Sequence, residues 1–177
     1  MAHLNIEIKA RCADAAPIAA LLRQRNARFV GVDHQIDTYF NVPNGRLKLR
    51  EGNIENALIH YERTDQEGPK RSDVTLLTVE KGSLIKEILT KSVGVKTVVD
   101  KRRQIFFIEN VKFHLDDVAS LGSFVEIEAI DTEGLRTADE LQKQCAFYMQ
   151  LFKIAKKDLL TNSYSDMTDK SIADGTH

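Results

Sequence analysis

Several short segments of this sequence alternate strictly between charged and apolar residues, a period of two that is typical of a β-strand with two unlike faces. Segment 46–50 places Arg46, Lys48 and Arg50 on one face, and segment 124–130 places Glu126 and Glu128 on one face. Same-face neighbours in a strand lie about 7 Å apart, so charges of one sign repel one another. The alternation therefore predicts a sheet whose charged face is compensated by counter-charges.

The sign of the charge separates strand by strand along the chain. Each strand taken alone also fits the solvent-exposed face of an antiparallel sheet, but such a face usually mixes signs. If the sheet curls so that these faces point inward, it forms a barrel or tunnel with a charged lumen and an apolar exterior that helices can cover. The basic residues at alternating positions are Lys9, Arg46, Lys48, Arg50, Arg63, Lys101 and Arg103, and the acidic residues are Glu7, Asp116, Glu126 and Glu128.

A lumen of this kind is suited to a polyanion. Arginine holds phosphate oxygens in bidentate geometry and lysine holds them as a point charge. Carboxylates bind hard divalent cations that bridge to the same oxygens, and Mg²⁺ or Mn²⁺ suits oxygen ligands. The pattern therefore predicts a site for phosphate and a divalent metal.

Period-two runs predict strands over 5–9, 37–40, 46–50, 57–63, 98–108, 111–116 and 124–130. We expect the chain to turn near Gly31 and to form a hairpin turn at 43–45. Residues 64–73 are expected to form a loop or a bulged strand entry. Its basic stretch 68–71 either contacts a base or phosphate at a tunnel mouth or is simply solvated.

Helical spacing of apolar residues predicts three helices. The first begins at Asp14 as N-cap and ends near Asn26, the second runs from Ser83 to Gly94, and the third covers 137–152 behind a capping box. Beyond Tyr164 the chain becomes polar. We therefore expect one domain over residues 1–166 and a flexible tail over 167–177.

Composition excludes several classes of function. The 177 residues carry 25 Lys and Arg against 26 Asp and Glu, so a net charge of -1 gives no global electrostatic case for nucleic acid or a membrane surface. The sequence contains no apolar run of membrane-spanning length and does not begin like a secretory signal, so we expect a cytoplasmic protein. Cys12 and Cys145 lack metal-ligand spacing and are expected to be reduced.

An ordered set of motifs resembles the CYTH or triphosphate-tunnel superfamily, which includes class IV adenylyl cyclases and thiamine triphosphatases. The motifs are Asn5-Ile6-Glu7-Ile8-Lys9, Leu47-Lys48-Leu49-Arg50-Glu51, Lys101-Arg102-Arg103, His114-Leu115-Asp116 and Gly122-Ser123-Phe124-Val125-Glu126-Ile127-Glu128. The resemblance covers residues 3 to 165, and its bacterial cyclase-like branch looks most similar.

The resemblance implies an α+β fold, an eight-stranded antiparallel β-barrel with flanking helices, which takes a triphosphate together with Mg²⁺ or Mn²⁺. It implies catalytic roles for Glu7 and Lys9. It also implies phosphate contacts by Lys9, Lys48, Arg50, Arg63 and Arg103, with Arg46 and Lys101 as secondary candidates, and metal binding by Glu7, Asp116, Glu126 and Glu128. The ligand would be a nucleoside triphosphate, thiamine triphosphate or an inorganic polyphosphate. The resemblance leaves open whether the chain forms a homodimer.

Two positions depart from the family pattern. Asn5 replaces the first acid of the Glu-x-Glu-x-Lys signature, which keeps an oxygen ligand but removes a negative charge. In the fourth strand, Arg63 shares a face with Tyr61 and Ile59, while His60 and Glu62 form the competing set. The departures leave open three functions: a cyclase, a triphosphatase, and a catalytically weak module that binds a nucleotide or polyphosphate.

The histidines and the last tyrosine receive structural interpretations. His34, His60 and His114 are expected to make local hydrogen bonds, although His114 lies on the face of Asp116. Tyr164, by family analogy, could close one end of the tunnel.

Overall fold

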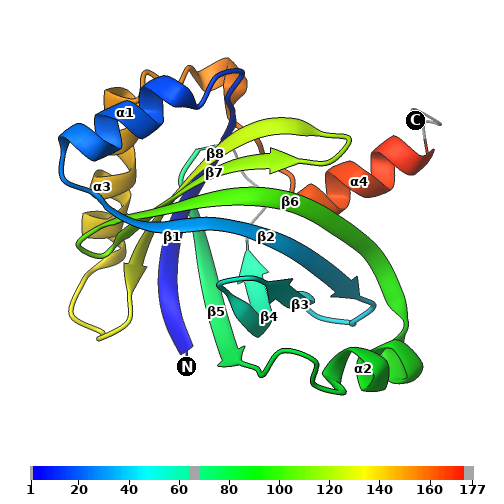
Figure 1. Cartoon of the computed structure of the whole chain (residues 1–177). Coiled ribbons are helices and arrows are strands. Elements are labelled where there is room, and N and C mark those ends of the chain that lie inside the picture. Colours follow the sequence, from blue (N-terminus) through cyan, green and yellow to red (C-terminus); the bar gives the residue numbers. More distant parts are fainter. Residues whose placement is uncertain (1, 64–67, 174–177) are drawn as a thin grey trace.

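The computed structural model describes residues 2–63 and 68–173, and within them eight strands close into an antiparallel barrel (Figure 1). The order around the barrel is β1-β5-β4-β3-β2-β6-β7-β8, with β8 pairing again with β1. The strands are β1 (Ala2–Arg11), β2 (Arg28–Phe40), β3 (Arg46–Gly52), β4 (Asn56–Arg63), β5 (Lys70–Thr78), β6 (Val95–Ile108), β7 (Val111–Val118) and β8 (Gly122–Asp131). The α+β barrel fold is therefore confirmed.

Strand β5 was missed by the sequence analysis. Residues 70–73 belong to it, although we expected a loop there, and residues 64–67 lie outside the described part of the chain. The reason is that β5 has no clear period of two: polar and apolar residues occur on both of its faces. Pairing with β1 and β4 on its two edges stabilises it instead.

The expected turn at Gly31 is also wrong. Gly31 lies inside β2, where the pairing with β6 shifts register, and its φ of 150° is a conformation that favours glycine. The glycine therefore marks a β-bulge in a strand of 13 residues, much longer than the predicted segment 37–40.

Three helices follow the sequence predictions closely. Helix α1 (Ala16–Gln24) has Ala15 as its N-cap, so the predicted N-cap Asp14 is wrong by one residue, although Asp14 accepts a hydrogen bond from the Ala16 amide at 2.9 Å. Helix α2 (Ile85–Val93) ends at Gly94, whose φ is 77°. Helix α3 (Ala138–Leu151) starts with the predicted capping box between Thr137 and Glu140.

A fourth helix, α4 (Tyr164–Ala173), occupies a segment expected to be a frayed tail. Ser163 caps it: the Ser163 hydroxyl accepts from the Asp166 amide at 3.2 Å, and the Asp166 carboxylate accepts from the Ser163 amide at 3.1 Å. Salt bridges from Arg46 to Asp166 and from Lys96 to Asp169 hold the helix against the barrel. Residues 167–173 of the expected flexible tail thus form part of helix α4, and residues 174–177 lie outside the described part.

The main apolar core lies outside the barrel wall, not in its lumen. Helices α1 and α3 pack over the outward faces of β1, β7 and β8, as Figure 1 shows for their shared side of the barrel. The outward residues Ile8, Phe113, Leu115, Val125 and Ile127 are at most 2% exposed. Burying these side chains against helices leaves the inward faces of the same strands free to carry charge.

Two further findings concern the chain as a whole. Within residues 2–63 and 68–173, no helix is long and apolar enough to cross a membrane. Cys12 and Cys145 are both free thiols, and the Cys145 thiol donates to the Ile6 carbonyl at 3.1 Å.

Candidate functional site

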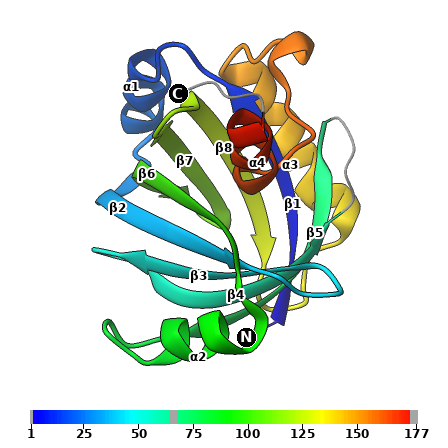
Figure 2. The same ribbon diagram turned by 90° about the vertical axis from the view of Figure 1, so that its right-hand side faces the viewer.

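A cavity of about 480 Å³ occupies the barrel lumen and is lined by residues from all eight strands. Helix α4 stands in front of the ring of strands in Figure 2, and Ser163 and Tyr164 at its start also line the cavity. Most of the predicted site residues meet here: Glu7, Lys9, Lys48, Arg50, Arg63, Lys101, Arg103, Glu126 and Glu128. Arg46 and Asp116 do not line this cavity.

The first cationic cluster is organised by Asp37 of β2, which is fully buried. Its carboxylate accepts two hydrogen bonds from Arg50, both at 2.9 Å, one from Lys101 at 2.6 Å and one from Lys48 at 3.0 Å. Burial would raise the pKa of Asp37, but Arg50, Lys101 and Lys48 outweigh it and hold that pKa well below its usual range. Three cations share one carboxylate, so the cluster retains excess positive charge.

Glu55, in the turn between β3 and β4, completes this cluster. It accepts from Arg50 at 3.0 Å and from Lys112 of β7. Asp33 shapes this turn because its carboxylate accepts from the backbone amides of Asn53, Ile54 and Glu55. Asp33, Asp37 and Glu55 were not among the predicted site residues, although Asp33 and Asp37 lie at even spacing within β2, where the same period of two places them on one face.

Lys101 is the most strongly buried lysine of the cluster, at 1% exposure. Burial lowers its pKa to about 7, and the nearby cations Arg50, Arg103 and Lys48 act in the same direction against the attraction of Asp37. The charge of Lys101 therefore changes near neutral pH in the protein without ligand.

The second cluster is organised by Glu126 of β8. Lys9 lies 2.7 Å from Oε1, and Arg103 and His114 lie 2.9 and 3.0 Å from Oε2. Burial would raise the pKa of Glu126, but Lys9 and Arg103 hold it well below its usual range. The Lys9 ammonium also lies 3.5 Å from the centroid of the Tyr164 ring.

Asp116 holds Arg103 rather than facing the cavity. Both of its oxygens accept from Arg103, at 2.6 and 2.5 Å, and Tyr164 donates to it at 2.8 Å. Its side chain is 0% exposed. The predicted metal ligand Asp116 thus does not line the cavity and instead holds Arg103, a phosphate-binding candidate that does.

Arg46 also lies outside the cavity that the other predicted basic residues line. It lies at the start of β3, pairs with Asp166 of α4 at 3.0 Å and lines a smaller pocket with Lys96 and Ser165. Its position follows from register, because Arg46 faces Tyr61 near the end of the barrel that α4 covers.

Of the two candidate sets in the fourth strand, the structure places that of Arg63 in the cavity. Arg63, Tyr61 and Ile59 line the cavity, whereas His60 bonds the Asn44 carbonyl outside it. Arg63 donates to Glu7 at 2.5 Å.

The basic stretch 68–71 is not wholly solvated. Lys70 is 1% exposed and donates to the carbonyls of Leu160 and Thr161, so it holds the segment before α4 in place.

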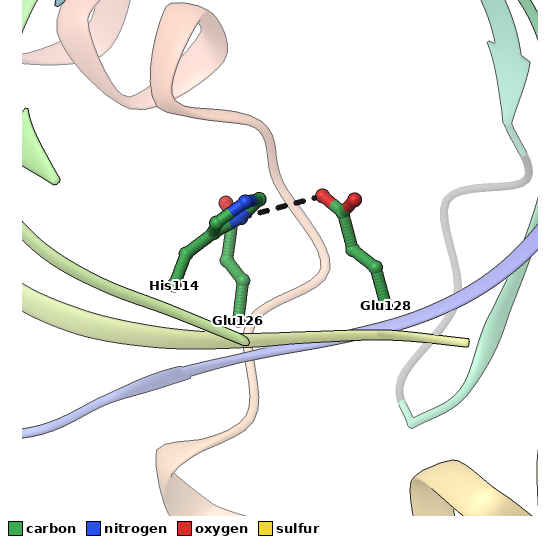
Figure 3. A group of neighbouring side chains, drawn as sticks. All are labelled: His114, Glu126 and Glu128. Carbon is green, nitrogen blue, oxygen red and sulfur yellow. Dashed lines mark hydrogen bonds and ion pairs between the residues drawn. The ribbon is translucent and has the colours of Figure 1, made fainter. Parts of the chain in front are cut away.

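Three side chains in the lumen could together hold a metal ion: His114, Glu126 and Glu128, whose ligand atoms lie within 4.8 Å of one another. Figure 3 shows them rising from β7 and β8 toward one another, with the His114 Nδ1 3.5 Å from Glu128 Oε1. Burial lowers the pKa of His114, which favours the neutral imidazole that a metal requires. Glu7 faces Glu128 directly in the β1–β8 register.

Asn5, at the position of the missing acid, also faces the lumen. It is 5% exposed, and its Oδ1 has no hydrogen-bond partner among the described residues. A buried amide oxygen without a partner is costly unless a ligand satisfies it.

Comparisons with known proteins agree with this architecture. The family model of the CYTH domain matches residues 3–164. A Methanocaldococcus jannaschii protein named "Putative adenylate cyclase" is 23% identical over 175 residues, covering 93% of this chain and 98% of that protein.

Two solved structures share the fold. A Pyrococcus horikoshii protein is 25% identical with a TM-score of 0.78, covering 92% of this chain and 98% of its own. The Hippeastrum protein HpAC1, described as having a dominant triphosphatase activity, is 12% identical with a TM-score of 0.60, covering 99% of this chain and 97% of its own.

Proposed function

The chain belongs to the CYTH domain family, and from this premise we propose that it is a divalent-metal-dependent enzyme that binds a triphosphate in its lumen and catalyses attack on one of the phosphorus atoms. The observation that carries the proposal is the separation of charge inside one cavity. A cationic cluster around Asp37 faces a carboxylate and imidazole cluster on β7 and β8.

The cationic cluster is suited to phosphate oxygens. Lys48, Arg50 and Lys101 already share Asp37, so their side chains are held in place before a ligand arrives. Their excess positive charge would be neutralised by an entering polyanion. Lys9, Arg63 and Arg103 extend the same surface toward β1 and β8, and each is oriented by a carboxylate.

The carboxylates on the opposite side fit a divalent cation. Glu126, Glu128 and Glu7 supply hard oxygen donors, which suit Mg²⁺ or Mn²⁺, and His114 adds a neutral nitrogen donor beside them. Such a cation, when bound, would neutralise phosphate oxygens and polarise the attacking group. Asp116 instead acts through Arg103.

Two reactions remain compatible with this arrangement. In a cyclase, the ribose 3′-hydroxyl attacks the α-phosphorus and pyrophosphate leaves. In a triphosphatase, water attacks the terminal phosphorus, the rest of the chain leaves as a diphosphate, and the attacked phosphorus is released as orthophosphate. In both, Lys9 and the arginines bind the non-reacting oxygens and withdraw charge from the leaving group. The Hippeastrum protein is described with a dominant triphosphatase activity, so this fold accommodates hydrolysis.

The decisive experiment is product analysis by phosphorus NMR. The purified protein is incubated with ATP, inorganic triphosphate or thiamine triphosphate, each with Mg²⁺ or Mn²⁺. Cyclic nucleotide with pyrophosphate identifies a cyclase, and orthophosphate identifies a triphosphatase. An absence of product together with an absence of thermal stabilisation by all three compounds overturns the proposal, because a ligand that binds the native state must stabilise it.

The metal assignment is tested by Glu128→Gln, which removes a donor charge at nearly constant volume. We expect metal-dependent turnover to fall at least about tenfold. Glu62→Gln is the matched control, since Glu62 points outward and is exposed. Equal turnover in the two variants would exclude Glu128 as a ligand.

A second function is favoured by Asn5: a module that binds a nucleotide or polyphosphate and turns it over weakly or not at all. Asn5 removes one negative charge from the site while leaving a buried oxygen in the lumen. Tight binding without product supports this alternative. A gain of turnover in Asn5→Glu would instead identify an enzyme that has lost a signature acid.

A further inference from the structure

The lumen has a second wall that the charged clusters do not use. On β4 and β5 the inward side chains include Ala57, Ile59, Tyr61, Val74 and Leu76, which form an apolar cluster lining the cavity. We call Ile59, Val74 and Leu76, together with Ala57, the apolar wall. It faces the same cavity as the phosphate-binding candidates.

Apolar side chains on a cavity wall make no favourable contact with an inorganic polyphosphate. A triphosphate is hydrophilic at every oxygen, and contact with aliphatic side chains removes its hydration without returning a hydrogen bond. Small-molecule pockets instead combine apolar walls with a few convergent polar groups. The cavity volume of about 480 Å³ lies within the range of about 300–1,000 Å³ typical of such pockets.

Two neutral polar residues lie at the border between the walls. Asn5 of β1 and Ser72 of β5 face each other in register, and both line the cavity. Ser72 is 1% exposed, and neither the Asn5 Oδ1 nor the Ser72 Oγ has a hydrogen-bond partner among the described residues. Uncharged groups at this border suit the point where a phosphate chain joins an organic group.

We infer that the apolar wall is a specificity subsite for a predominantly hydrophobic organic group esterified to the phosphate chain. The inference rests on the proposed function, because it assumes that the charged clusters hold the phosphates. The apolar wall consists of aliphatic carbon with few polar atoms. It therefore favours ligands whose organic group buries apolar surface, and not ligands recognised through hydrogen bonds. Inorganic triphosphate occupies only the charged half of the lumen.

The test is a series of alkyl triphosphates, methyl, propyl and hexyl, compared with inorganic triphosphate and ATP by isothermal titration calorimetry. EDTA is present so that metal-dependent turnover does not consume the probes. Each methylene that the wall buries should tighten binding about fourfold, which is the value of about 0.8 kcal/mol per methylene. ATP should bind less tightly than the hexyl ester.

Matched variants locate the effect. Leu76→Asn places an amide on the apolar wall, and Leu77→Asn places the same amide on the outer face of the same strand, where Leu77 is 59% exposed. The chain-length dependence should be lost in Leu76→Asn and kept in Leu77→Asn. If Leu76→Asn does not fold, the nearly isosteric Val74→Thr should weaken the dependence in the same direction.

The outcomes separate the two proposals. An affinity that is the same for all alkyl chains and for inorganic triphosphate overturns the subsite and leaves the proposed function standing. Tighter binding of ATP than of the hexyl ester overturns the hydrophobic character of the organic group. Failure of every probe to bind, inorganic triphosphate included, both in EDTA and with Mg²⁺ added in its place, overturns both.

Discussion

The two halves of the barrel have opposite polarity. On β7 and β8, under helices α1 and α3, apolar residues such as Phe113 and Ile127 point outward, and charged residues such as Glu126 point inward. On β4 and β5 the order is reversed for Ile59 and Leu76, which point inward, and for Glu62 and Asp73, which point outward and are exposed, although the exposed Leu77 also lies outward.

The difference follows from what covers each half. A sheet face packed under helices can be fully apolar, so its other face is free to carry charge at little cost to folding. The outward face of β4 and β5 carries exposed residues, most of them polar, and Ile59, Val74 and Leu76 of those strands lie in the lumen. The position of helices α1 and α3 therefore accounts for the apolar outward face and the charged inward face of β7 and β8.

The largest effect is expected from Asp37→Asn, in the cationic cluster on β2, β3 and β6. The substitution leaves Lys48, Arg50 and Lys101 without their shared counter-charge inside the barrel. Breaking a buried ion-pair network in this way costs about 3–5 kcal/mol in the free energy of unfolding, measured by urea denaturation. The control is Asp100→Asn, at an exposed pair with His34, which should change stability by less than about 1 kcal/mol. Equal effects would show that the cluster is not an organised site.

A smaller effect is expected from Tyr164→Phe, which removes the hydroxyl that donates to Asp116 at 2.8 Å. A hydrogen bond to a charged group contributes about 1.5–3 kcal/mol, so the midpoint of urea unfolding should fall accordingly. Tyr148→Phe is the control, because the Tyr148 hydroxyl makes no hydrogen bond within the described part of the chain. An unchanged free energy of unfolding in Tyr164→Phe would show that the start of α4 does not help to hold Asp116 and Arg103.

The pH dependence of binding tests the charged half in a different way. Since the pKa of Lys101 is lowered to about 7, the lysine is largely neutral above that pH, and a bound polyanion favours its charged form. Binding should then take up a proton, and affinity for inorganic triphosphate should fall as pH rises above 7, by at most about tenfold per pH unit.

Calorimetry between pH 6.5 and 9 measures this dependence. Lys101→Arg keeps the positive charge throughout this range, so the difference in slope between the wild type and Lys101→Arg isolates the lysine from the titration of the ligand itself. Parallel slopes would contradict the role of Lys101.

The smallest effect is expected on the apolar half from Ile59→Val. Loss of one buried methyl group costs about 0.5–1.5 kcal/mol of stability, measured by urea denaturation. Affinity for inorganic triphosphate should stay unchanged, because that ligand does not use this wall. A large fall in that affinity would contradict the division of the lumen into a charged half and an apolar half.

The charged faces of the strands could be recognised from the sequence because their signal is local. Period two places Arg46, Lys48 and Arg50 on one face, and Glu126 and Glu128 on another, without any knowledge of how the strands pair. The same reasoning chose Arg63 over His60 and Glu62. The capping box of α3 and the glycine that ends α2 were equally local.

The partners of these charges could not be read from the sequence. Asp37 meets Lys101, 64 positions away, and Asp116 meets Tyr164, 48 positions away. Arg46 and Asp116 carry the same local pattern as their neighbours, yet register places the first beside α4 and the second behind Arg103. Strand β5 and helix α4 were missed because pairing partners, salt bridges and a serine cap stabilise them rather than amphipathic periodicity.

The sequence by itself determined which residues share a face, because alternation along a strand is a property of the backbone alone. Only the tertiary structure decided which faces meet across the lumen, since closure of the barrel sets the register between strands that are distant in the chain. The opposition of a charged wall to an apolar wall belongs to this second kind. It exists only once the barrel has closed and β4 lies across from β7.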